Sequence, residues 1–109
     1  MPAIFLALTL ADAAAEVQWR RLSSTTGDLP IPGESQQQTA CVVVDADKDG
    51  VNDFVLGFRQ KAPALVWYRR ATNGWRRYVI EKDYLALEAG GAVCDIDGDR
   101  DLDLVLGGD

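Results

Sequence analysis

Short apolar runs separated by polar turns recur along the chain, and this pattern predicts strands. The run at residues 40–44 is continuous, which favours a strand buried on both faces, and a second run covers residues 54–58. Residues 64–69 and 75–81 are rich in aromatic and β-branched side chains, and the Asn-Gly pair between them is typical of a hairpin turn. The chain is therefore predicted to be all-β.

A sequence repeat organises these strands. The segment that starts at residue 40 matches the segment that starts at residue 90, with a constant offset of 50 and no gap. The matched aspartates are Asp45 with Asp95, Asp47 with Asp97, Asp49 with Asp99, and Asp53 with Asp103. Self-similarity at this period, with four strands in each period, is typical of β-propeller blades. We therefore predict a partial β-propeller of about one and a half four-stranded blades, with an Asp-rich loop between the first two strands of each blade.

The repeat also predicts how the chain is divided. Residues 19–22 resemble residues 75–78, so residues 16–24 are predicted to be the outer strand of a preceding blade. The Pro/Gly/Gln-rich residues 25–38 are predicted to be a loop. Residues 39–83 form a complete blade with the first loop at 45–53, and residues 84–109 start the next, truncated blade with the second loop at 95–103. Propellers close with about 4 to 8 blades, so we expect the rest from a longer chain or from self-association.

Residues 1–15 have a different composition. An apolar run over residues 3–10 is followed by small residues in A-x-A patterns. This order is typical of the end of a secretory signal peptide, although a basic n-region is missing, and an apolar N-terminal helix is the alternative. The run is too short for a transmembrane helix, which needs about 20 apolar residues. We therefore expect no membrane span and a secreted, periplasmic or cell-surface location.

Negative charge is concentrated in the two Asp-rich loops. The net charge is −6, and 9 of the 17 acidic residues lie in residues 45–53 and 95–103. This local acidity favours cation sites, and the missing basic field argues against nucleic-acid binding. The chain has no histidine, which excludes the commonest general base and most zinc chemistry. No nucleophile–base pair is recognisable, so no catalytic residue is assigned.

The spacing of the loop aspartates predicts calcium binding. Positions 1, 3, 5 and 9 of a tight loop can turn carboxylate oxygens toward one centre, and position 7 can add its backbone carbonyl. The predicted ligands of the first loop are Asp45, Asp47, Asp49, the Val51 carbonyl and Asp53. Those of the second loop are Asp95, Asp97, Asp99, the Asp101 carbonyl and Asp103. An EF-hand is excluded because position 12 is leucine in both loops and the flanks are strand-like. The alternative is a solvated Asp-rich turn without an ion.

The two loops differ at position 6. Gly50 of the first loop can adopt a positive φ without strain, whereas the second loop has Arg100 there. Arg100 is therefore expected to adopt a strained backbone or to bend the loop differently, and it brings positive charge close to the cation. We expect the second loop to be the weaker site.

The tandem D-x-D-x-D-[GR]-x-x-D units, each followed by V-L-G, resemble VCBS or FG-GAP-type repeats. The resemblance covers about residues 16–109 and implies a calcium-binding β-propeller of the kind found in secreted proteins and in the integrin α head. It further implies a binding, adhesion or structural module, with a carbohydrate or another protein as partner. The alternative is the propeller portion of a carbohydrate-active enzyme, of polysaccharide lyase or sugar dehydratase type, with catalytic residues mostly outside this chain.

Three further groups of residues are open to interpretation. Cys41 and Cys94 are predicted to be two buried free thiols, because the repeat places them at different heights and on opposite faces. The aromatic residues around the hairpin are expected to pack between blades, with sugar stacking as the alternative. The arginines of the same hairpin are expected to be solvated, with binding of an anionic polysaccharide as the alternative. These hairpin residues are Trp67, Tyr68, Arg69, Arg70, Trp75, Arg76, Arg77 and Tyr78.

Overall fold

The computed structural model describes residues 16–109, so the predicted signal-peptide-like segment 1–15 lies outside the described residues. Six strands and no helix are present in the described part of the chain. The strands are β1 (Gln38–Val44), β2 (Asp53–Phe58), β3 (Leu65–Ala71), β4 (Gly74–Glu81), β5 (Leu87–Cys94) and β6 (Asp103–Gly108). The all-β prediction is confirmed.

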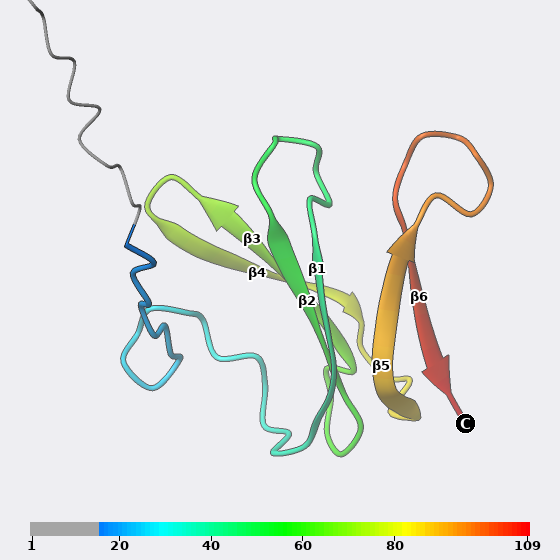
Figure 1. Cartoon of the computed structure of the whole chain (residues 1–109). Coiled ribbons are helices and arrows are strands. Elements are labelled where there is room, and N and C mark those ends of the chain that lie inside the picture. The colour runs from blue at the N-terminus through cyan, green and yellow to red at the C-terminus, as the bar shows by residue number, and fades with distance from the viewer. Residues whose placement is uncertain (1–15) are drawn as a thin grey trace, which may run out of the picture.

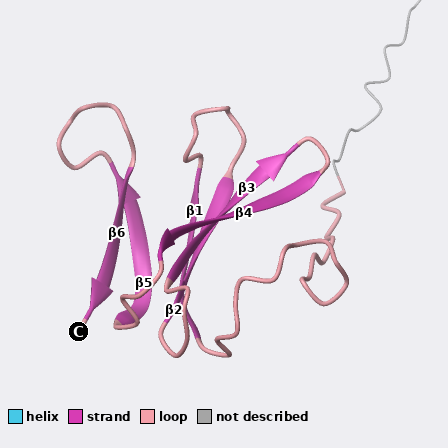
Figure 2. Ribbon diagram, turned by 180° about the vertical axis from the view of Figure 1, so that it is seen from behind, coloured by secondary structure: helices cyan, strands magenta, loops and turns pink. Residues whose placement is uncertain are grey.

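The strands form two antiparallel sheets (Figures 1 and 2). The first sheet has the order β1-β2-β3-β4, so each strand pairs with the next one along the chain. The second sheet is the β5–β6 hairpin, which stands beside β1. Both Asp-rich loops connect the first two strands of their sheet, as predicted. Among residues 16–109 there is no helix that could cross a membrane.

The β3–β4 hairpin forms at the predicted turn. Ala71 pairs with Gly74, and Thr72 and Asn73 make the connection. Gly74 has a φ of 113°, which a glycine adopts without a steric penalty. The turn chemistry read from the sequence therefore fixes the register of these two strands.

The main core lies between the first sheet and the β5–β6 hairpin. Val44, Val55 and Leu87 are buried there, and side chains of both β5 and β6 pack against them. The opposite face of the first sheet carries a smaller cluster of Phe58, Val66 and Tyr68. Two hydrophobic layers therefore lie on either side of the first sheet, and only the first has a second sheet above it.

Strand β1 corrects two expectations. Val42 and Val44 are buried, but Val43 is 62% exposed, so the continuous apolar run is not buried on both faces. The hairpin β5–β6 covers one face of β1, and no described segment covers Val43. Cys41 and Cys94 are free, as predicted, but both thiols are exposed rather than buried.

Residues 16–24 form no strand, which contradicts the predicted outer strand of a preceding blade. A strand needs a hydrogen-bonding neighbour, and no described strand lies beside this segment. The following segment is held against the first sheet instead. Leu29 packs on the Phe58 cluster, and the Tyr68 hydroxyl donates a 2.6 Å hydrogen bond to the Pro30 carbonyl.

Candidate metal centre

The two Asp-rich loops start and end in the same register. Val44 pairs with Asp53 across the mouth of the first loop, and Cys94 pairs with Asp103 across the mouth of the second. These pairs are related by the 50-residue offset of the repeat. The loops are therefore equivalent in length and attachment.

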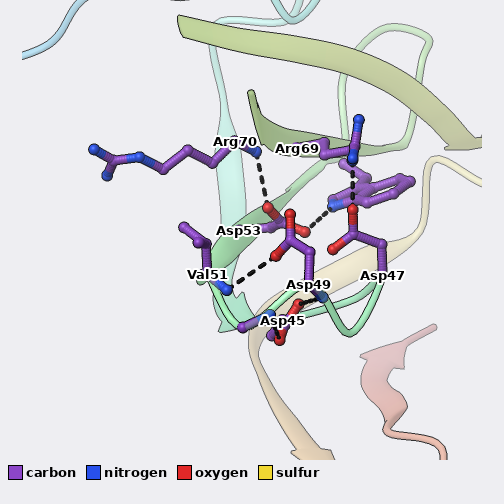
Figure 3. A network of polar contacts seen from close by, with 9 residues as sticks. Asp45, Asp47, Asp49, Val51, Asp53, Arg69 and Arg70 are labelled. Carbon is purple, nitrogen blue, oxygen red and sulfur yellow. Dashed lines mark hydrogen bonds and ion pairs between the residues drawn. The ribbon is translucent and has the colours of Figure 1, made fainter. Parts of the chain in front are cut away.

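Backbone amides organise the first loop (Figure 3). The Asp45 carboxylate accepts hydrogen bonds from the amides of Asp49 and Gly50, at 3.1 and 2.8 Å. Asp49 Oδ1 accepts a 2.9 Å hydrogen bond from the Val51 amide. These bonds fold the loop over its own carboxylates, as in an Asx turn.

The second loop repeats this pattern. The Asp95 carboxylate accepts hydrogen bonds from the amides of Gly98 and Arg100, at 2.8 and 2.9 Å. Asp99 Oδ1 accepts one from the Asp101 amide, also at 2.8 Å. In both loops position 1 therefore accepts from the amide of position 6, and position 5 accepts from that of position 7.

Positive φ angles occur at positions 4 and 6 of both loops. Position 6 has φ 85° at Gly50 and 76° at Arg100, which confirms the strained backbone predicted for Arg100. Position 4 has φ 59° at Lys48 and 75° at Gly98, a requirement that the sequence analysis missed. Each loop therefore has glycine at one of these positions and a strained long side chain at the other.

Three carboxylates converge in each loop. One oxygen from each of Asp45, Asp47 and Asp49 lies within 4.8 Å of the others, and the same holds for Asp95, Asp97 and Asp99. Three negative charges at this separation repel one another unless a cation lies between them. The donors are all hard oxygen atoms, which suits calcium rather than zinc or copper.

Asp47 has two different oxygens. Its Oδ2 accepts from the Arg69 guanidinium in an ion pair, and this hydrogen bond holds the pKa of the Asp47 carboxyl below its usual value. Its Oδ1 is buried and has no hydrogen-bond partner. A buried carboxylate oxygen without a partner is costly in the absence of a ligand.

The position 9 aspartates lie apart from these triads. Asp53 is only 1% exposed, and its two oxygens accept from the Arg70 amide at 2.8 Å and from the Trp67 indole nitrogen at 3.0 Å. Asp103 Oδ2 accepts a 2.9 Å hydrogen bond from the Ile96 amide. The structure therefore groups positions 1, 3 and 5 and gives position 9 to the base of the loop.

The position 7 residues also differ. Val51 is exposed, whereas the Asp101 side chain forms an ion pair with Lys48 of the first loop. Asp101, and more weakly Asp99 and Asp95, raise the pKa of the Lys48 ammonium. This contact joins the two loops, and the repeat alone gave no signal of it, because Lys48 has a glycine as its counterpart.

A polar groove of about 650 Å³ lies between the first loop and the β3–β4 hairpin. Arg69, Arg70 and Arg76 contribute to its wall, and the Arg70 guanidinium lies 5.5 Å from the centre of the Trp75 ring. The neighbouring aromatic residues pack within the sheet: Tyr68, which is buried, stacks on Phe54 at a ring distance of 4.8 Å.

Comparison of the chain with protein-family models, curated proteins and solved structures finds no significant match.

Proposed function

We propose that this chain is a calcium-binding repeat segment of a β-propeller in an exported protein, where it serves as a binding, adhesion or structural module. Calcium would be bound by the carboxylates at positions 1, 3 and 5 of each loop. Its role would be to hold the loop in place, since no nucleophile or general base lies beside either triad among the described residues.

The observation that carries the metal proposal is the repetition of one carboxylate geometry in two loops 50 residues apart. A solvated turn needs no such convergence, because turn aspartates satisfy themselves with backbone amides. The unpartnered Oδ1 of Asp47 adds independent support, since a cation would satisfy it. Magnesium fits less well, because it keeps several waters and uses few carboxylates.

Two features support the propeller. The first sheet is a four-stranded meander, as each blade of a propeller is. The first strands of successive repeats, β1 and β5, contact each other, which is the arrangement expected of neighbouring blades. A partner carbohydrate or protein follows from the resemblance to VCBS and FG-GAP-type repeats, and no observation favours the enzymatic alternative.

Calorimetric titration of calcium into the chelator-treated full chain tests the metal proposal. We expect binding heat from the first loop, a weaker second event, and little heat with magnesium under the same conditions. Calcium at ten times its Kd should stabilise the fold by about 1.4 kcal/mol per site. The absence of binding heat, together with an unchanged melting temperature after chelation, would contradict the proposal.

A further inference from the structure

The contact between the first sheet and the β5–β6 hairpin has a donor side and an acceptor side. On the first sheet, Val44 and Val55 are buried beneath Val93 and the two leucines of β6. At Gly91 the hairpin comes so close that an added Cβ would lie 2.6 Å from Val42 Cγ2. The first sheet therefore presents one face, and the hairpin packs its own face against it.

The repeat places an equivalent of each side elsewhere in the chain, at an offset of 50 residues. The acceptor face is the equivalent of the packed face of the hairpin and lies on the far side of the first sheet. It consists of Cys41, Val43, Phe54 and Leu56. The donor face is the equivalent of the buried face of the first sheet and lies on the outer side of the hairpin. It consists of Ala92, Cys94 and Val105.

Both faces are open among the described residues. Val55 is 1% exposed beneath the hairpin, whereas its equivalent Val105 is 42% exposed. Val93 packs in the core, whereas its equivalent Val43 is 62% exposed. The same positions are therefore buried once within the chain and left uncovered once on each side.

The sizes of the side chains point to the occupant. Within the chain, Gly91 of the acceptor side lies against Val42 of the donor side. At the open faces the equivalent pair is Cys41 and Ala92, so the acceptor position is larger and the donor position is smaller. Because close packing conserves total volume, these two substitutions compensate each other only if the two open faces meet.

We propose that a second copy of this chain docks head to tail, with the donor face of one copy on the acceptor face of the next. The proposal rests on the repeat architecture of the proposed function but not on calcium. Leu29 covers only the Phe58 cluster and its neighbours, so β1, with Cys41 and Val43, stays accessible. A heterologous contact of this kind continues until it closes as a ring, and otherwise forms a filament.

Light scattering after size-exclusion chromatography, over a range of concentrations of the full chain, tests the docking. Wild type should show a mass that rises with concentration, whereas Val43→Asp and Val105→Asp should each stay monomeric. Mixing the two variants should restore one contact and give a dimer that grows no further. Val17→Asp is the matched control, because Val17 is 74% exposed and lies on neither face.

Each other outcome is decisive. Wild type that stays monomeric at the highest soluble concentration overturns the proposal, and so does a preceding repeat of a longer chain that fills the acceptor face. If Val105→Asp associates like wild type while Val43→Asp does not, the acceptor faces pair with each other and head-to-tail docking is wrong.

Thiol alkylation provides a test without substitutions. Cys41 and Cys94 lie on the two faces and are exposed in the single chain, so both should react more slowly as the concentration rises. Unchanged rates would contradict the docking. Calcium titration of Val43→Asp should match wild type; lost calcium binding with intact association would refute the metal proposal alone.

Discussion

The two Asp-rich loops have equivalent backbone hydrogen bonds but different surroundings. The first loop closes over a four-stranded sheet, where Asp53 is buried against Trp67 and Arg69 holds Asp47. The second loop closes a two-stranded hairpin, and its aspartate triad is exposed. The comparison teaches that the motif sets the fold of the loop, whereas the neighbouring strands set how rigidly its carboxylates are held.

The position 9 aspartates should separate the loops most strongly. Asp53→Asn places an amide group opposite two donors, the Trp67 indole and the Arg70 amide, so one donor loses its acceptor in a buried place. We expect the free energy of unfolding to fall by about 1–3 kcal/mol. Asp103→Asn, which affects one exposed hydrogen bond, should cost less than about 1 kcal/mol. Urea denaturation measures both, and equal losses would contradict the asymmetry.

Calcium affinity should depend on position within the loop as well as on the loop. Asp47→Ala removes a carboxylate of the triad, so we expect the Kd of the first loop to rise by about tenfold or more. Asp101→Ala leaves its backbone carbonyl in place and should have a smaller effect on the second loop. Calorimetric titration compares the two variants. Similar losses in both would show that the ligand assignment is wrong.

Position 6 allows a reciprocal exchange between the loops. Arg100→Gly relieves a φ of 76° and should stabilise the chain by about 1 kcal/mol, and removal of the guanidinium should also strengthen calcium binding by the second loop. Gly50→Ala forces a residue with a Cβ to φ 85° and should destabilise the chain by a similar amount. Thermal unfolding with and without calcium measures both effects. Changes of the same sign in the two variants would contradict the strain argument.

Much of this architecture could be predicted from the sequence because it rests on local patterns. The Asn-Gly turn and the constant offset gave the β3–β4 hairpin and the position of both loops. The structure bears out the convergence of positions 1, 3 and 5, which alternation along a short loop is enough to produce.

The remaining features depend on contacts that no local pattern contains. Asp53 looks like any other loop aspartate until β3 places Trp67 and Arg70 beside it. Burial of β1 on both faces needs two covering sheets, and the hairpin supplies one. The strand predicted at residues 16–24 needs a neighbouring strand, which the described residues do not contain.

The ion pair between Lys48 and Asp101 should give the smallest effect and the sharpest view of how the loops interact. Both side chains are more than half exposed, so Lys48→Met should change stability little, and any change should vanish as salt screens the pair. The lysine nevertheless brings positive charge to the second loop, where Asp95 and Asp99 also raise the pKa of its ammonium. Lys48→Met should therefore strengthen calcium binding by the second loop and leave the first triad unchanged. Lys61→Met is the matched control, since Lys61 pairs with Glu34 away from both loops. If calcium titration gave the same second-loop affinity for wild type and Lys48→Met, the weakness of that loop would have to arise from Arg100 and exposure alone.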